Sequence, residues 1–345
     1  MKKLGLAFGV LVLLLAMGNP TFAQLGGSVG YAFLGIAPTA KAAALGGLLP
    51  QNGSEDAAAM LYNPAGHATS GIASVGYNPF GGRFRYSTVA AMADAWQGTA
   101  GAAVQFIDYG TFAGFDPAGN ATGTFRANAY VATFNYSRAL GPFRYGANFK
   151  MAGSSIEAYN SFGIGADIGF AYKHPKKNFS AGLCLQNMGA TLQRFTPDGD
   201  RSWPFQIHAG ASYKFEHMPV RFFATTQQLQ RWDIVYLDPR YNVVIDPSGQ
   251  QQPQRKPWTE KLFRHVAIGA ELSLGKSVLV RGGYNHLLRK EMKLAEGSAG
   301  AAGYSFGVGL KLKKMQLDYT HMLVSSSGGA NFINLSYAFG RQPGA

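Results

Sequence analysis

The chain has 345 residues, of which 14% are charged, 13% are aromatic and 45 are glycine. Its mean hydropathy of -0.04 excludes a helical membrane protein, because each spanning helix would need an apolar run of about 20 residues. The hydrophobic share of 47% argues against a disordered chain. Few charges together with many aromatics and glycines favour an all-β barrel.

Residues 1–23 have the features of a secretory signal peptide. The basic pair Lys2-Lys3 precedes the apolar run Leu4–Ala16, and Thr21-Phe22-Ala23 places small residues at the two positions that a signal peptidase inspects. Cleavage there makes Gln24 the first residue of the mature chain. The alternative, a transmembrane anchor, would need a longer apolar run.

The formal net charge of +13 points to anionic partners. An exported chain rarely meets nucleic acid, so outer-membrane lipid headgroups and anionic lipopolysaccharide are the partners we expect, with a merely solvated basic rim as the alternative. The single cysteine, Cys184, excludes an internal disulfide and a cysteine-based zinc site. Export without disulfides fits the outer membrane of a Gram-negative bacterium.

Residues 24–70 are predicted to form a hatch of short helices inside a barrel mouth. The alanine-rich run Pro38–Leu45 ends at two glycines, which is typical of a short helix. Ser54, followed by two acidic residues, is the expected N-cap of a second helix that runs through Met60. An ordinary periplasmic arm is the alternative. The candidate hatch motif consists of Gly46, Gly47, Asn63, Pro64 and Ala65.

Residues 71–340 are predicted to form a transmembrane β-barrel, because alternating segments follow one another along the whole stretch. The expected number of antiparallel strands is about fourteen. The predicted strands are Ile72–Asn78, Arg83–Ala95, Gly98–Tyr109, Arg126–Arg138, Phe143–Gly153, Ser161–Lys173, Asn178–Met188, Trp203–Phe215, Val220–Gln228, Phe263–Leu274, Ser277–Leu287, Gly303–Leu312, Met315–Val324 and Asn331–Phe339.

The last of these segments shows the pattern most clearly. Large apolar residues such as Ile333, Leu335 and Tyr337 fall on one face, and small or polar residues such as Asn334 and Ser336 fall on the other. In a barrel the apolar face meets lipid and the polar face meets the lumen. No unpaired edge survives in lipid, so the last strand is expected to pair with the first.

The predicted connectors alternate between short turns and long loops, as at the periplasmic and extracellular rims of an outer-membrane barrel. The long ones are Gly110–Phe125, Ser154–Asn160, Gly189–Ser202, Leu229–Leu262 and Leu288–Ala302. This parity places both termini in the periplasm. Several short turns carry lysines, which either bind phosphates or are simply solvated.

The longest connector, Leu229–Leu262, is predicted to lack regular structure and to contact a partner. Loops of this length are usually functional or disordered, and this one is rich in aromatic residues. The alternative is a loop that folds inward over the lumen. The candidate partner-binding residues are Trp232, Asp233, Tyr236 and Trp258.

No enzyme is predicted, and no cofactor. Gly303–Gly307 matches the pattern of a nucleophile elbow, but that motif needs a strand-to-helix turn, and here Ser305 lies inside an alternating strand. The seven histidines are dispersed without metal-ligand spacing. Lumen charges are expected to pair with one another; they include Lys150, Asp167, Arg281 and Asp318.

Two resemblances follow from these motifs. The alanine-rich helix ending at Ala44-Leu45-Gly46-Gly47, together with Asn63-Pro64-Ala65, resembles the hatch of the long-chain fatty-acid transporter barrels, which have fourteen strands. The whole mature chain looks more closely like the related PorV/PorQ group of type IX secretion barrels. The segments that carry this likeness are Gly27–Leu34, Thr122–Phe125, Ser161–Asp167, Asn178–Leu183, Pro204–Ile207 and Leu229–Asp233.

The second resemblance implies a non-enzymatic outer-membrane protein of Bacteroidetes-type bacteria. Barrels of that group hold a surface partner, a PorZ-like protein, within a complex that attaches cargo to anionic lipopolysaccharide. Residues 341–345 depart from the group by extending past the terminal aromatic residue. The first resemblance leaves open a different function, the transport of hydrophobic small molecules such as fatty acids.

Overall fold

The computed structural model describes residues 31–47, 49, 55–66, 70–80, 84–196, 202–235, 243–245, 251–253, 257–292, 300–325 and 328–340. The predicted signal peptide, Ser54 and Tyr236 lie outside these residues.

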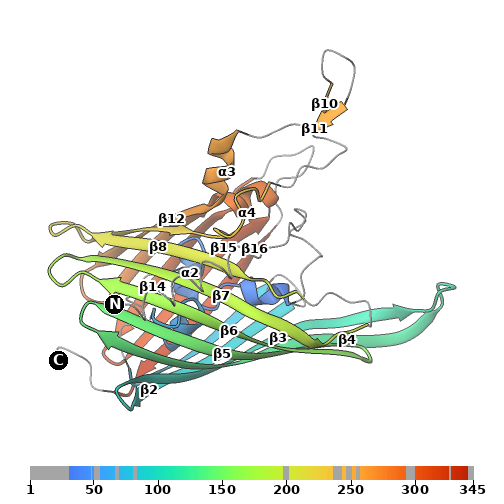
Figure 1. Ribbon diagram of the computed structural model, residues 1–345, viewed down its shortest axis with the longest axis horizontal. Coiled ribbons are helices and arrows are strands. Elements are labelled where there is room, and N and C mark those ends of the chain that lie inside the picture. The colour runs from blue at the N-terminus through green and yellow to red at the C-terminus, as the bar shows by residue number, and fades with distance from the viewer. Residues whose placement is uncertain are drawn as a thin grey trace, which may run out of the picture.

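Fourteen strands form one closed antiparallel barrel, in the order β1-β16-β15-β14-β13-β12-β9-β8-β7-β6-β5-β4-β3-β2 (Figure 1). The first strand pairs with the last, with Val75 opposite Leu335. The predicted strand number and closure are therefore confirmed. The strands are β1 (Ile72–Phe80), β2 (Phe84–Ala95), β3 (Gly98–Phe115), β4 (Ala121–Leu140), β5 (Phe143–Ile156), β6 (Tyr159–Lys173), β7 (Phe179–Gln193), β8 (Gln206–Lys214), β9 (Val220–Thr226), β12 (Val266–Leu274), β13 (Val278–Asn285), β14 (Tyr304–Leu312), β15 (Met315–Ser325) and β16 (Gly328–Ala338).

The two faces of the sheet differ as the alternation predicts. On β14, Tyr304, Phe306 and Val308 are exposed on the outer face, whereas Ser305 and Gly307 are buried on the inner face. The same division recurs around the barrel, so the outer wall is a band of exposed aromatic and aliphatic side chains. A closed sheet with an apolar outer wall satisfies every strand edge and suits a lipid solvent.

The hatch consists of η1 (Ala32–Gly35), α2 (Ala40–Ala44) and η2 (Ala57–Leu61). Thr39 caps α2 by accepting a 3.2 Å hydrogen bond from the Ala42 amide. The second helix is a 3-10 turn whose N-cap is Asp56, so the prediction of Ser54 as its cap is wrong. The Asp56 side-chain oxygen accepts from the Ala58 amide at 2.9 Å, which is the usual role of an N-cap residue.

The barrel wall binds the hatch through its main chain. Ser305 and Thr320 donate side-chain hydrogen bonds of 3.0 and 2.7 Å to the carbonyls of Ala44 and Ala40. Asn148 and Gln186 donate to the η2 carbonyls at 2.9 and 2.7 Å. These donors come from β5, β7, β14 and β15, so the hatch lies within the lumen and its carbonyls are satisfied by the surrounding wall.

Glycines on the inner wall make room for the hatch. A side chain at Gly169 would collide with the Asn63 amide and would lie 2.7 Å from Pro64 Cδ, and one at Gly283 would lie 2.5 Å from the Ala44 carbonyl oxygen. Real Cβ atoms do not approach this closely, so these wall positions accept only glycine while the hatch is docked.

Two predicted loops are largely strand. Where a long loop over residues 110–125 was expected, β3 and β4 continue as a paired ribbon and leave only residues 116–120 as a loop. Phe112 and Phe125 stack across this ribbon, with ring centroids 5.5 Å apart. Likewise β5 and β6 continue to a two-residue connection where residues 154–160 were expected to be a loop. The predicted parity of connector lengths therefore holds only in part, because cross-strand pairing extends several strands past one rim.

The predicted loop 229–262 contains regular structure, contrary to expectation. It holds the hairpin strands β10 (Val243–Ile245) and β11 (Gln251–Pro253) and the start of α3 (Trp258–Arg264). A second helix, α4 (His286–Glu291), follows β13, and its N-cap Asn285 accepts from the Leu288 amide at 3.2 Å. Phe263 and Leu287 were predicted to lie in strands and lie instead in α3 and α4. Among the described residues, no helix is long and apolar enough to span a membrane.

The glycine requirement at the hatch contact gives a first prediction. Gly169→Ala places a methyl group against Asn63 and is expected to loosen hatch docking by about 1–3 kcal/mol through overpacking. The barrel sheet itself should persist. Hydrogen-exchange mass spectrometry of the purified barrel would show faster exchange in residues 55–66. The matched control is Gly282→Ala, because nothing lies within 4 Å of a Cβ at Gly282. Equal exchange in both variants would contradict the steric account.

Candidate functional site

The described part of the predicted partner-binding loop is tied to the base of α3. Trp232 stacks on His265, with centroids 5.5 Å apart and planes inclined at 21°. The buried His265 ring also lies 2.8 Å from the Gln227 carbonyl oxygen through Nδ1 and 3.2 Å from the Trp232 carbonyl oxygen through Nε2. One histidine therefore fixes both the main chain and the ring of the segment that leaves β9.

Asp233 forms an ion pair with Lys261 of α3 and accepts from the Val235 amide at 3.2 Å. Slight burial opposes ionisation, but the Lys261 hydrogen bond outweighs it, and the pKa of Asp233 lies below its ordinary value. Asp233 therefore stays charged and joins the loop to the helix. In the structure this carboxylate binds Lys261 and Val235, which belong to the same rim of the barrel.

A second charged cluster joins α3 to α4. The Glu260 carboxylate lies 3.3 Å from Arg264, 3.5 Å from His286 and 3.4 Å from Lys290. Partial burial raises the pKa of Glu260, but Lys290 and Arg264 more than compensate and hold it below the ordinary value. The two helices therefore form one unit at the loop rim of the barrel (Figure 1).

This unit presents apolar side chains to solvent. Trp258 is 66% exposed, Phe263 57% and Trp232 54%, and Leu262 is exposed beside them in sequence. We call these four residues the loop-rim patch. Figure 1 shows α3 outside the barrel. The alternative of an inward-folding loop would place this helix over the lumen. Exposed aromatic residues on a rigid, ion-paired support are typical of protein-binding surfaces.

The structure brings together three of the four predicted loop residues. Trp258 is the first residue of α3. Trp232 contacts His265 at the end of that helix, and Asp233 contacts Lys261 within it, whereas Tyr236 lies outside the described residues. Sequence reasoning missed His265 and Phe263, because both were assigned to a neighbouring strand or its edge. One sequence signal could have revealed this helix. Pro257 stands at its start, the acidic Glu260 lies in its first turn and the basic Arg264 lies in its last turn.

The predicted hatch motif is buried against the wall. The Asn63 amide donates to the main-chain carbonyls of Phe170 at 3.0 Å and Leu183 at 3.5 Å, and its oxygen accepts from Ala65 at 2.9 Å. The Pro64 carbonyl accepts from Asn135 at 3.1 Å. These contacts make the motif a device that positions the hatch.

The two glycines of the motif serve the turn after α2. Gly46 and Gly47 have φ values of +99° and +103°, a conformation that residues with a side chain rarely adopt. The Gly46 carbonyl accepts from Asn285 at 2.9 Å, which ties this turn to the end of β13.

Lumen charges pair inside the barrel, as predicted. Lys150 lies 2.8 Å from Asp167, which also accepts hydrogen bonds from Asn148 and Asn187. Arg281 bridges Glu271 and Asp318. Each charge is compensated within a polar network, which is the condition for burying it.

Two groups that resemble catalytic nucleophiles, Ser305 and Cys184, are buried in barrel strands. Ser305 donates to the Ala44 carbonyl from within β14, so it occupies no strand-to-helix elbow. Cys184 is a free, buried thiol on the inner wall. Within the described residues, no group of three or more His, Cys, Asp or Glu side chains could hold a metal ion.

The apolar outer wall, the closed sheet and the luminal hatch define an outer-membrane-type β-barrel. The chain shares this fold with the P. putida toluene transporter TodX, at a TM-score of 0.51 and 13% identity over 89% of this chain and 99% of TodX. A deltaS2 mutant of the TodX monoaromatic hydrocarbon channel gives a TM-score of 0.55 and 15% identity, covering 88% of this chain and 99% of that one. No family model matches the chain, and no curated protein matches it.

A pH prediction follows from the hatch, outside the spanning strands. Burial raises the pKa of Asp56 to about 6, against an unfolded value near 3.8. Its protonated form therefore stabilises the docked hatch, an effect that is full below about pH 4 and lost as pH rises through about 6. Exchange of residues 55–66, corrected for the intrinsic pH dependence of amide exchange, should slow between pH 7 and pH 5.

Asp56→Asn is expected to abolish this pH dependence, because the amide is neutral throughout and keeps an oxygen acceptor for the Ala58 amide. The control is Asp116→Asn in the exposed β3–β4 loop, which should retain the wild-type profile. A flat profile in the wild-type protein would contradict the prediction.

Proposed function

We propose that this protein is a non-enzymatic barrel of the type IX secretion system, similar to PorQ, which resides in the outer membrane of Bacteroidetes-type bacteria. Its role is to anchor a PorZ-like surface partner of the complex that attaches cargo to anionic lipopolysaccharide. The observation that carries the proposal is the loop-rim patch, in which Trp258, Phe263 and Trp232 are exposed on an ion-paired helical support.

The character of the patch favours docking. Large aromatic side chains dominate protein interfaces because they bury much area with little loss of side-chain entropy. Here they stand on α3, whose orientation is held by Asp233 on one side and α4 on the other. A partner binding there would therefore meet a surface that is already ordered, which lowers the entropic cost of association.

The lumen also supports a docking role. The hatch packs buried apolar residues against the inner wall, among them Ala42, Ala43 and Leu45. The neighbouring lumen charges pair with one another instead of lining an open apolar track. A barrel of this kind serves as a membrane anchor without needing a passage through its centre.

The second candidate function is transport of hydrophobic small molecules. It is favoured by the fold shared with TodX, a toluene transporter and monoaromatic hydrocarbon channel. It also draws on the hatch motif, which the sequence resemblance associates with fatty-acid transporter barrels.

The docking proposal predicts that Trp258→Ser with Phe263→Ser releases the partner. Loss of two exposed aromatic anchors should weaken binding about tenfold or more. The measurement is recovery of the PorZ-like protein with the affinity-tagged barrel from detergent-solubilised outer membranes. The control is Trp96→Ser, an exposed tryptophan in the turn between β2 and β3. Undiminished recovery with the double variant would rule out the patch as the docking site.

The transport alternative predicts a different outcome. Deletion of the gene should slow uptake of a radiolabelled long-chain fatty acid or aromatic hydrocarbon, and the double variant should restore uptake because it leaves the barrel wall intact. Unchanged uptake after deletion would remove this alternative.

A further inference from the structure

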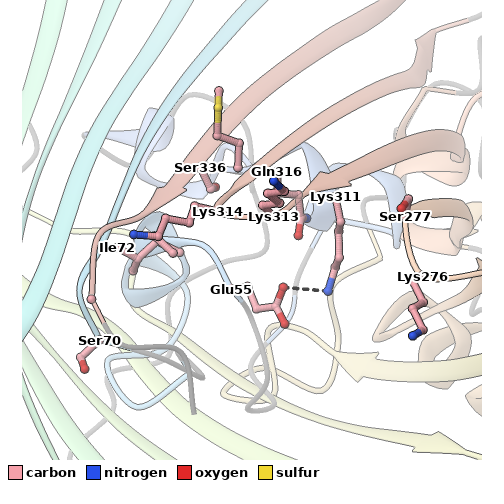
Figure 2. A pocket seen from close by; sticks show the side chains of 13 residues that line it. Glu55, Ser70, Ile72, Lys276, Ser277, Lys311, Lys313, Lys314, Gln316 and Ser336 are labelled. Atoms are coloured by element: carbon pink, nitrogen blue, oxygen red, sulfur yellow. Dashed lines mark hydrogen bonds and ion pairs between the residues drawn. The ribbon is translucent and has the colours of Figure 1, made fainter. Parts of the chain in front are cut away.

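Two adjacent cavities open at the turn rim of the barrel, the end opposite the loop-rim patch. They have volumes of about 370 and 360 Å³, and both are lined by Glu55, Lys311 and Gln316. Figure 2 shows the first cavity, with the Glu55–Lys311 ion pair inside it and lysines of the short turns around it. We call the two cavities together the turn-rim vestibule.

Most of the cationic residues that line the second cavity belong to the inner face of the wall. Lys173 continues the inward row of β6 that contains Asp167, Lys214 the row of β8 that contains His208, and Lys311 the row of β14 that contains Ser305. Since successive side chains on a strand alternate between faces, these lysines project toward the lumen and not toward lipid. The charge is therefore directed into an enclosed space.

The vestibule carries an excess of positive charge. Among the described residues that line the second cavity, seven are Lys or Arg and two are Glu. Glu271 is already shared by Lys41 and Arg281. Lys173, Lys177 and Lys214 form no ion pair with any described residue. Converging cations of one sign repel one another, so an anion bound among them would be stabilised.

Neutral donors lie beside these cations. The Ser180 and Ser212 hydroxyls are 2.8 Å apart, and Arg221 donates to Ser212 at 3.2 Å. Ser180 and Arg221 line the cavity. Hydroxyl, ammonium and guanidinium groups together are the donors that proteins use for phosphate oxygens.

A carboxylate of the hatch already occupies part of this field. Lys311 Nζ lies 2.7 Å from Glu55 Oε2, and Glu55 directly precedes the cap of η2. Both side chains of this pair are accessible from the cavities, so the pair can exchange partners with a ligand. Glu55 thus competes with any external anion for Lys311.

We propose that the turn-rim vestibule is a binding site for a small anion that carries phosphate groups. The volume accommodates a diphosphate or the headgroup of a phospholipid. In an outer-membrane barrel the short turns face the periplasm, so the ligand comes from that side, either as a water-soluble phosphate compound or as the headgroup of an inner-leaflet lipid. The site is remote from the loop-rim patch and does not rest on the docking role.

The test uses the full mature chain, purified in a neutral detergent. Isothermal titration calorimetry with inorganic pyrophosphate at constant ionic strength should give saturable binding. Lys173→Gln with Lys214→Gln should weaken it about tenfold, because two unpaired cations are lost. Glu55→Gln should tighten it about threefold or more, because Lys311 loses its competing carboxylate.

The matched control is Lys176→Gln with Arg138→Gln. It removes the same number of positive charges, one in a short turn and one near the end of β4, from positions that line neither cavity. Binding in this control should equal that of the wild type. If it falls as far as in the vestibule variant, the attraction is a property of net charge and the proposal is wrong.

A lipid arm separates the two sources of phosphate. Native mass spectrometry should compare retention of phosphatidylglycerol with that of phosphatidylcholine by the wild type and the vestibule variant. Pyrophosphate binding alone identifies a soluble ligand. Retention of phosphatidylglycerol that is lost in the vestibule variant identifies a lipid headgroup. Absence of both overturns the proposal, whatever the outcome of the partner-capture experiment.

Discussion

The structure depends on the need to satisfy every backbone hydrogen bond of a sheet that is surrounded by lipid. An open edge in hydrocarbon is too costly to persist, so β1 must pair with β16 along their shared length. The closure is completed beyond the strands, where the Gly71 carbonyl accepts from the Phe339 and Gly340 amides at 2.7 and 2.8 Å. Once the sheet is closed, its inner face becomes a compartment of fixed volume. The hatch, the paired charges and the turn-rim vestibule all divide that volume between them.

Much of this architecture could be predicted from the sequence, because alternation is a local signal that survives without knowledge of neighbours. The fourteen strands, the α2 helix and the inward position of Ser305 all follow from patterns within a few residues. The β3–β4 ribbon was missed because small residues, several of them glycine, surround its few aromatic residues, and because its turn is held by Asp116, which accepts from the Ala118 and Asn120 amides. Helix α3 was missed because seven residues are too few for a clear helical period.

The candidate sites needed information that one strand does not contain. Lys150 and Asp167 were recognised as lumen residues, but their contact depends on the diagonal register between β5 and β6. The loop-rim patch depends on His265 and Lys261, which lie about thirty positions from the residues they hold. The vestibule gathers side chains from the hatch and from strands across half of the barrel. Such convergence is a property of closure, and no linear pattern specifies it.

The hydrogen bonds between wall and hatch have a consequence for how this protein changes over evolution. Ser305, Thr320 and Asn148 bind carbonyl oxygens of the hatch, a group that every amino acid supplies. At these contacts the wall therefore distinguishes hatch sequences by the bulk of their side chains and not by their chemical identity. Exchanges among small residues at Ala40 and Ala44 would preserve these hydrogen bonds, whereas Asn63, whose side chain itself contacts the wall, could not be exchanged in the same way.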